Sequence, residues 1–360
     1  MIKERPLQEV RWGRCQAPLR RPYRLSFTEL HTLDVVWVRL RDSDGRVGLG
    51  EAVALPGYGW ETADEIAQTV AHLLEEASHL TANELRSRCL SLAKTHPFAV
   101  SAILTALELP DYLPALSVGF QVPLALPLAG DASENSLREQ LLQGLTDGWR
   151  SFKIKIGRSF SQERANLEML LTLPTEQIFT LSCDANQGYD RFQAQVLADS
   201  LARSNHYQRL LWFEQPLNQE DWDGVAELCR VTSVPILLDE SIHDADDIIR
   251  AARIGVQGIK FKLCKCPGMA ALLALIRLGR ECGLRMVFGN GVASDIGALG
   301  EMAIISQAGH LLEAPFECNG VAKLERPLLS TGLWQVGIGT IRSLYDGDTL
   351  ALLLEQEHKP

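Results

Sequence analysis

Eight short apolar runs follow one another through the second part of this 360-residue chain, and helix-length amphipathic segments separate them. The runs are 122–128, 152–156, 178–183, 210–213, 235–238, 258–263, 285–288 and 311–314. A strand followed by a helix, repeated eight times, is the sequence pattern of a (β/α) barrel. An open doubly wound sheet is the alternative, but no G-x-G-x-x-G motif follows a first strand, which disfavours it.

The first part of the chain has a different pattern. Residues 7–54 contain three stretches of strand character, and the sequence DSDG at 42–45 predicts a tight turn within an antiparallel meander. Helical patterns follow at 62–76, 82–94 and 98–109. Thr62 is a good N-cap because Glu65, three residues later, can complete a capping box. Strands followed by helices indicate a small α+β domain.

These patterns divide the chain into three parts. We expect an α+β domain over 1–118, an α/β barrel domain over 119–324, and a C-terminal segment over 325–360 that returns to the first domain.

Charge and hydrophobicity exclude several kinds of partner. The chain has 45 acidic and 35 basic side chains, a net charge of −10, which argues against nonspecific nucleic-acid binding. The opening sequence MIKERPLQEV lacks the apolar core of a signal peptide. No apolar run approaches the ~18 residues that a membrane helix needs. We therefore expect a cytoplasmic protein without membrane insertion, and a homo-oligomer is compatible with the sequence.

Charged residues stand at the ends of five successive runs. They are Lys153 with Lys155, Asp184, Glu214, Asp239 with Glu240, and Lys260 with Lys262. Catalytic groups of a (β/α) barrel gather at the C-terminal ends of its strands, so these side chains should meet at one mouth. A lone charged residue at a strand end is usually a solvated loop residue or half of an ion pair. Five strand ends in register, in the order Lys, Asp, Glu, Asp, Lys, favour a catalytic site instead.

The three carboxylates of this set suit a metal ion. Asp184, Glu214 and Asp239 are separated by 30 residues (214 − 184) and 25 residues (239 − 214), which is one β/α unit each time. Without a cation they would repel one another and their pKa values would rise. Mg²⁺ removes this repulsion because it prefers oxygen ligands, and Mn²⁺ suits the same ligands.

Lysines beside such a metal are suited to proton transfer at carbon. One lysine can remove the proton next to a carboxylate of a small-molecule substrate, and the metal then stabilises the enediolate as a Lewis acid. A lysine base near neutral pH needs a lowered pKa. We expect Lys153 and the metal to lower the pKa of Lys155.

Five motifs resemble those of a known family. They are Lys-x-Lys at 153–155, Asp-Ala-Asn-Gln at 184–187, Glu-Gln-Pro at 214–216, Asp-Glu-Ser at 239–241 and Lys-Leu-x-Lys-Cys at 262–266. Over almost the whole chain, the sequence resembles the muconate-lactonizing subgroup of the enolase superfamily. The resemblance implies a modified (β/α)7β TIM-like barrel with an N-terminal α+β capping domain that the C-terminal tail completes.

The resemblance also implies roles for single residues. Lys155, the second lysine of Lys-x-Lys, is the expected acid/base, and Lys262 faces it from the sixth strand. Lys260 and Lys265 compete for this second position, but Lys262 fits the family pattern best and Lys260 should lie a layer deeper. The residues expected to support the metal and the base are Lys153, Asn186 and Glu240.

Segments 48–52 and 55–62, and the pair Arg21-Pro22 before a strand, resemble the capping region of o-succinylbenzoate synthases. These enzymes dehydrate a cyclohexadiene carboxylate, SHCHC, by syn β-elimination on the route to menaquinone or phylloquinone. The substrate contacts expected from this interpretation are Tyr58, Trp60, Gly291 and Ser294. Each has an alternative: the aromatic residues can pack a domain interface, Gly291 can serve a plain turn, and Ser294 can cap the next helix.

Other reactions on the same scaffold stay open. Dipeptide epimerisation and N-acylamino-acid racemisation need the same two lysines. A dipeptide epimerase of this subgroup usually has Asp-x-Asp near the eighth strand, whereas residues 312–317 read LEAPFE, although Glu313 or Glu317 can substitute. Muconate cycloisomerase is a further alternative that the capping region disfavours. A non-catalytic binding barrel is the least favoured, because the lysine pair and the acidic set are intact.

Overall fold

A computed structural model of the chain describes residues 6–24, 29–55, 59–290 and 292–357. Its N-terminal part contains an antiparallel sheet in the order β1-β2-β3, formed by Leu7–Arg24, Glu29–Asp42 and Val47–Val53. The Asp42 carboxylate closes the β2–β3 turn by accepting the backbone N–H groups of Asp44 and Arg46, both at 3.0 Å. The predicted meander is therefore confirmed.

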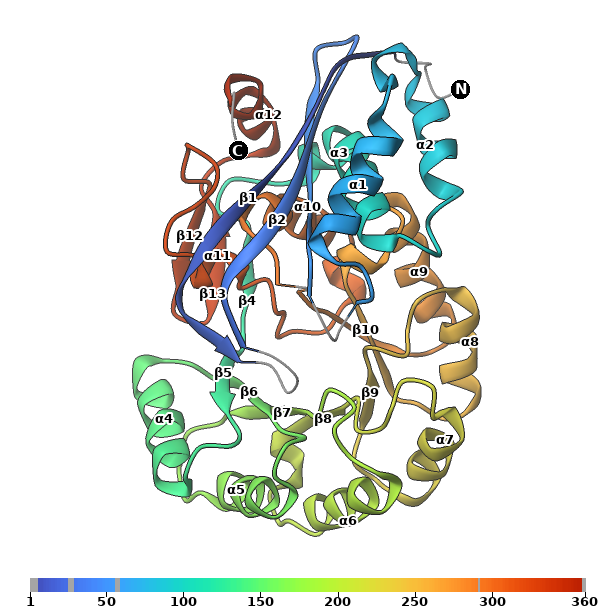
Figure 1. Cartoon of the computed structure of the whole chain (residues 1–360). Coiled ribbons are helices and arrows are strands. Elements are labelled where there is room, and N and C mark those ends of the chain that lie inside the picture. The colour runs from blue at the N-terminus through green and yellow to red at the C-terminus, as the bar shows by residue number, and fades with distance from the viewer. Residues whose placement is uncertain (1–5, 25–28, 56–58, 291, 358–360) are drawn as a thin grey trace.

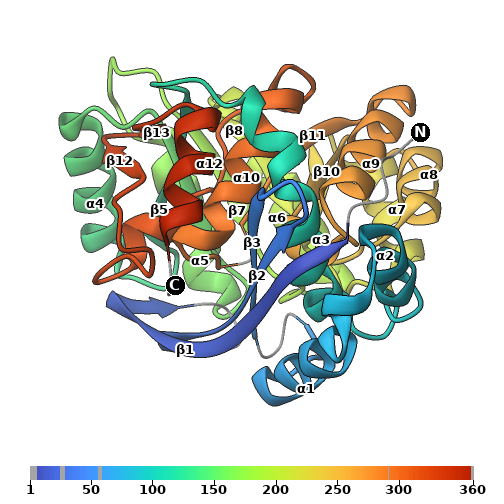
Figure 2. The ribbon, with the colours of Figure 1, turned by 90° about the horizontal axis from the view of Figure 1, so that it is seen from above.

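Helices cover one side of this sheet. They are α1 (Ala63–Leu74), the 3₁₀ turn η1 (Ala77–His79), α2 (Ala82–Leu90) and α3 (Pro97–Tyr112). Thr62 caps α1 in a complete capping box with Glu65, as predicted. A Cβ atom on Gly50 would lie 2.0 Å from the Ala102 carbonyl oxygen, so glycine allows β3 to lie directly against α3. Helix α3 lies beside both this sheet and helix α10 (Asp295–Ala308) of the barrel (Figure 2).

Seven parallel strands form the second sheet, in the order β11-β10-β9-β8-β7-β6-β5. The strands are β5 (Leu126–Ala129), β6 (Ser151–Lys155), β7 (Thr180–Asp184), β8 (Leu210–Glu214), β9 (Ile236–Leu238), β10 (Gly258–Phe261) and β11 (Arg285–Phe288). The helices that connect them are α4 (Glu134–Asp147), α5 (Phe160–Thr172), α6 (Arg191–Ala202), α7 (Trp222–Val231), α8 (Ala245–Arg253) and α9 (Met269–Glu281). They surround the curled sheet in Figure 1. Short 3₁₀ turns lie at η2 (Leu113–Ala115), η3 (Tyr207–Arg209), η4 (Leu263–Lys265) and η5 (Gly309–Leu311).

The eighth predicted run closes the barrel through isolated bridges. After α10 (Asp295–Ala308), Glu313 pairs in parallel with Val287 of β11, and Phe316 pairs in parallel with Leu124. The segment therefore fills the gap between the two ends of the sheet. The first predicted run, 122–128, is split into two strands, because β4 (Gln121–Pro123) leaves the barrel to pair elsewhere and only β5 joins the parallel sheet.

The C-terminal segment contacts both domains. The hairpin β12 (Trp334–Gly337) and β13 (Thr340–Ser343) forms an antiparallel sheet with β4 beside the barrel. Helix α12 (Gly347–Gln356) instead reaches the first domain, where the Arg39 guanidinium donates to the Leu354 carbonyl at 3.3 Å. Among the described residues, no helix is both long enough and apolar enough to span a bilayer.

Candidate active site

The register of the parallel sheet brings the charged strand ends to one level. Lys155 is paired with Asp184 across β6 and β7, and Asp184 is paired with Glu214 across β7 and β8. Asp239 follows β9 directly, and Lys262 follows β10. All of these side chains except Lys155 are almost completely buried. The residues singled out in the sequence therefore meet at one mouth of the barrel.

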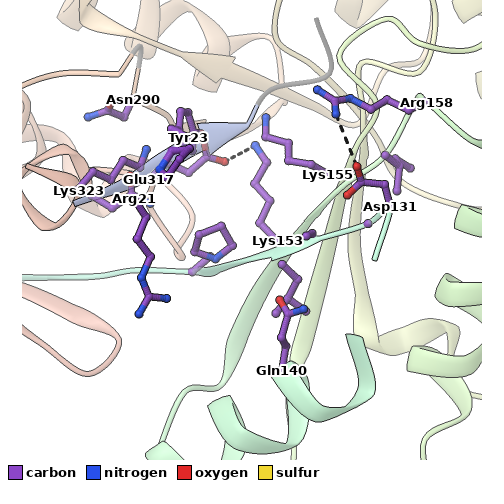
Figure 3. Close-up of a pocket in the computed structure, with 18 residues that line it drawn as sticks. Arg21, Tyr23, Asp131, Gln140, Lys153, Lys155, Arg158, Asn290, Glu317 and Lys323 are labelled. Atoms are coloured by element: carbon purple, nitrogen blue, oxygen red, sulfur yellow. Dashed lines mark hydrogen bonds and ion pairs between the residues drawn. The ribbon is translucent and has the colours of Figure 1, made fainter. Parts of the chain in front are cut away.

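Lys153 and Lys155 form one side of this cluster. The Lys153 ammonium lies 2.7 Å from Asp184, 2.9 Å from Glu214 and 2.6 Å from Glu317. The Lys155 ammonium lies 2.6 Å from Asp184 Oδ2 and 3.0 Å from Asn186 Oδ1. Figure 3 shows both lysines extended side by side from β6.

The lysines of the sixth strand form the other side. Lys262 Nζ lies 2.6 Å from Asp239 Oδ2, and Lys265 Nζ lies 3.2 Å from Asp239 Oδ1. Lys260 is only 1% exposed and contacts Glu214 and Glu317 instead. Lys155 and Lys262 thus approach the carboxylate cluster through different acids, Asp184 and Asp239.

Two opposing effects set the pKa values in this cluster. Burial raises the pKa of Glu214 to about 8, and the neighbouring Asp184 carboxylate adds to the rise. Burial also opposes ionisation of Asp184 and Asp239, but the adjacent ammonium groups outweigh it, so both pKa values lie well below their usual range. Burial lowers the pKa of Lys155, yet Asp184 reverses the shift and raises it. Without a metal the Asp184 carboxylate outweighs Lys153, so the net shift is upward; the predicted lowering concerns Lys155 beside a bound metal and stays a prediction.

The donor chemistry of the cluster fits a hard divalent cation. Asp184, Glu214 and Asp239 supply oxygen atoms from three adjacent strand ends, as Mg²⁺ prefers. One buried carboxylate oxygen beside them, Glu240 Oε2, has no hydrogen-bond partner. Within the described part of the chain, no three acidic, histidine or cysteine side chains stand together as a ready metal centre. Lysine ammonium groups instead contact Asp184 and Asp239.

The supporting residues that were predicted surround this cluster. Asn186 accepts from Lys155 and donates to Glu240 Oε1 at 2.9 Å, so it links two strand ends. Asn186 also has a positive φ of 40°, a conformation that asparagine adopts more readily than most residues, and its backbone N–H donates to Asp184 Oδ1 at 3.0 Å.

A cavity of about 390 Å³ opens beside the Lys153 and Lys155 side of the cluster (Figure 3). Its other charged or aromatic walls come from β1, the loops after β5 and β6, and the segment after the barrel. These wall residues are Arg21, Tyr23, Asp131, Arg158, Glu317 and Lys323. The cavity volume is in the range of small-molecule sites.

The predicted substrate contacts are distributed differently. Tyr58 and Gly291 lie outside the described residues. Trp60 is 59% exposed and is not among the cavity walls, and its indole N–H donates to the Thr95 carbonyl at 2.8 Å. Ser294 is fully buried, accepts from the Ile296 backbone N–H at 3.1 Å and caps α10. The structure thus gives Ser294 its alternative role as a helix cap.

The sequence analysis named Glu317 only as a substitute for Asp-x-Asp in a dipeptide epimerase, and did not place it beside the lysines. Glu317 accepts from Lys153 at 2.6 Å and from Lys260 at 2.8 Å, and neighbouring lysines overcome the effect of burial and hold its pKa well below its usual range. The predicted eighth run ended at Ala314, three residues too early. The signal was the one used for the other strands, a charged residue after an apolar stretch, here Phe316-Glu317.

Comparisons with known proteins agree with this architecture. Residues 9–108 match the family described as "Mandelate racemase / muconate lactonizing enzyme, N-terminal domain", and residues 136–319 match "Enolase C-terminal domain-like". The chain is 30% identical to the o-succinylbenzoate synthase of Thermosynechococcus vestitus, over 86% of this chain and 90% of that protein. It is 27% identical to an L-Ala-D/L-amino acid epimerase of Populus trichocarpa, over 87% of this chain and 75% of that protein.

A solved structure agrees with the fold. The L-Ala-D/L-Glu epimerase of Bacillus subtilis superimposes with a TM-score of 0.82, at 19% identity, over 94% of this chain and 96% of that one. Relatives at 23–30% identity include epimerases, racemases, cycloisomerases and a synthase, so the family leaves the individual reaction open. With both of its domain families matched, the chain belongs to the enolase superfamily, in the mandelate racemase and muconate-lactonizing group.

Proposed function

We propose that this enzyme is an o-succinylbenzoate synthase, which removes water from SHCHC to give o-succinylbenzoate. The observation that carries the proposal is a cavity with an excess of cationic walls next to the base candidate Lys155. SHCHC has two carboxylates, so a cationic cavity suits it better than a substrate with a free ammonium group.

In the proposed reaction, Lys155 acts as the neutral amine, which a cation bound at Asp184 would favour by offsetting that carboxylate. Its Nζ removes the proton from the carbon next to the ring carboxylate. The electron pair of that C–H bond becomes the new C=C bond, and the C–O bond of the neighbouring carbon breaks. The ammonium formed at Lys155 returns the proton to the departing hydroxyl, which leaves as water. Because the same lysine gives and takes the proton, both bonds break on one face of the ring.

Asp184, Glu214 and Asp239 are the proposed ligands of Mg²⁺, and Mn²⁺ suits the same oxygens. When bound, the metal would offset the negative charge that grows on the substrate carboxylate as the proton leaves. Lys262 is proposed to stabilise the ring from the opposite face, as a cation beside a π-system does.

The acids of segment 312–317 support the synthase over a dipeptide epimerase. Glu317 is engaged by two lysines, and Glu313 forms an ion pair with Arg285 at 2.6 Å. Neither carboxylate is therefore in a position to hold the ammonium group of a dipeptide.

N-succinylamino-acid racemisation is a second candidate, because such substrates also have two carboxylates. A relative from Bacillus cereus named N-succinyl-L-Arg/Lys racemase is 23% identical, over 81% of this chain. The same cationic cavity suits its class of substrate.

The decisive experiment incubates the purified protein with SHCHC and Mg²⁺ and follows the loss of SHCHC absorbance. Parallel reactions in deuterium oxide measure exchange of the α-proton of N-succinylamino acids and of dipeptides. We expect rapid dehydration of SHCHC that a chelator abolishes. No dehydration, together with exchange on dipeptides, would overturn the proposal in favour of an epimerase.

A further inference from the structure

Most of the cations in the cavity are matched by carboxylates. Lys153 contacts three acids and Lys155 contacts Asp184. Arg158 lies 3.6 Å from Asp131 at the opposite edge of the cavity (Figure 3). A cation that already faces a carboxylate attracts an anionic ligand more weakly.

Two other cations of the cavity have no such match. Among the described residues, neither Arg21 nor Lys323 forms an ion pair with a carboxylate, although both line the cavity. Glu301 is close enough to Lys323 to interact, but burial raises the pKa of Glu301 to about 8, so this carboxyl is mostly protonated near neutral pH. This end of the cavity therefore carries uncompensated positive charge.

An aromatic ring holds one of these cations in place. The Lys323 ammonium lies 3.8 Å from the centroid of the Tyr23 ring, a cation–π contact. Burial raises the pKa of the Tyr23 hydroxyl, but Lys323 and Lys155 outweigh it and the net shift is downward. The Tyr23 hydroxyl therefore interacts electrostatically with both lysines. Lys323 lies in the segment after the barrel, and Lys155 lies in β6.

We propose that Lys323, seated on Tyr23 and assisted by Arg21, binds a second anionic group of the substrate, while Lys155 removes the proton next to the first anionic group. The inference deepens the proposed function and rests on it, because it assigns the distal carboxylate of a dicarboxylate substrate to this end of the cavity. Lys323 is a specificity-determining residue and not a proton carrier. It comes from α11 (Gly320–Lys323), whereas Tyr23 and Arg21 come from β1, so both domains contribute to the subsite.

The test compares a dianion with a monoanion of nearly equal shape. Binding of o-succinylbenzoate and of its succinyl-end carboxamide is measured by titration calorimetry in the presence of Mg²⁺. We expect the wild-type protein to prefer the dianion by about tenfold, which is the scale of one charge-assisted contact. Lys323→Met keeps the apolar stem on Tyr23 but removes the charge, so it should abolish this preference.

Two further variants serve as controls for charge and for folding. Lys323→Arg should keep most of the preference, and Lys94→Met, at an exposed lysine of the first domain, should keep all of it.

Arg21→Met should lower the preference for the dianion as well, and it gives an independent answer if Lys323→Met does not fold. In steady-state kinetics with SHCHC, Lys323→Met should raise KM about tenfold with little change in kcat.

The inference is overturned if folded Lys323→Met and Arg21→Met both prefer the dianion as strongly as the wild type. Its failure is separable from failure of the proposed function. Absence of SHCHC dehydration by the wild type, with the charge preference intact, contradicts the synthase but supports the subsite. Dehydration without any charge preference supports the synthase and contradicts the subsite.

Discussion

Two buried acidic clusters lie in this molecule, and most of their side chains shift in opposite directions. At the barrel mouth, lysines hold the pKa values of Asp184, Asp239 and Glu317 below their usual range, whereas burial and the Asp184 carboxylate raise that of Glu214 to about 8. At the seam between the capping domain and the barrel, burial raises the pKa of Glu51 to about 7 and that of Glu301 to about 8. Burial penalises the charged form in both places, and the nature of the partner decides the outcome.

The seam partners are neutral donors. Glu51 of β3 accepts the Ser294 backbone N–H at 2.6 Å and also its hydroxyl, at the start of α10. Glu301 of the same helix accepts the Asn290 side-chain amide at 3.0 Å. The mouth therefore keeps most of its acids charged, whereas the seam joins two domains through acids whose pKa values lie near or above neutral. Four predictions test this division.

The largest effect is expected at the mouth. Lys155→Ala should lower kcat about 10³-fold, since it removes the proposed acid/base. The fold should persist because Asp184 keeps Lys153 at 2.7 Å. Dehydration of SHCHC and circular-dichroism melting measure the two properties. Retained activity would show that Lys155 is not the base, and a collapsed fold would show that the mouth is structural.

At the seam, stability should depend on pH instead. Glu301 has a pKa of about 8 when folded against an ordinary 4.5, so the folded state retains a proton that the unfolded state releases. Stability is complete below about pH 4.5, falls as the pH rises and levels off above about pH 8, a loss of the order of a few kcal/mol.

Glu301→Gln removes this titration while it keeps an acceptor for Asn290, so urea unfolding should depend less on pH in the variant. If the free energy of unfolding depended on pH equally in the variant and the wild type, Glu301 would be ionised in the folded protein.

Substitution of a proposed metal ligand should affect the mouth alone. Asp239→Asn should weaken Mg²⁺ binding at least tenfold, about 1.4 kcal/mol, in a calorimetric titration. Glu313→Gln, at an ion pair away from the cluster, is the matched control. Unchanged affinity of the Asp239 variant would remove this residue from the ligand set.

The smallest effect is expected at an exposed polar contact in the capping domain. Thr62→Ala breaks the capping box of α1 and should lower the free energy of unfolding by about 1 kcal/mol, with no effect on Mg²⁺ binding. Thr81→Ala, in the equivalent box of α2, should behave alike. A loss larger than the pH-dependent loss expected at Glu301 would contradict this order of effects.

Much of the fold was predictable because its signals are local. Strand periodicity, the 42–45 turn and the Thr62 capping box each depend on residues a few positions apart, and all three are confirmed. The meeting of Lys155, Asp184 and Glu214 was also predictable, since parallel strands in register must bring their ends to one edge.

The remaining features depend on contacts between distant residues. The split of the first run follows from β4 pairing with β13, some two hundred positions later, as Ile341↔Val122 shows. Glu51 meets Ser294 across a separation of 243 residues, and Lys323 meets Tyr23 across one of 300 residues (323 − 23).

The sequence by itself determined which residues carry charge at the strand ends, because side-chain alternation and helix spacing are short-range properties of the chain. Only the tertiary structure decided which partner each charge has, and therefore the direction of each pKa shift. The Lys155 pKa is the clearest case: its neighbour in sequence, Lys153, lowers it, but Asp184 from the next strand raises it more. Electrostatic energy depends on distance in space and on burial, and neither is set by position along the chain.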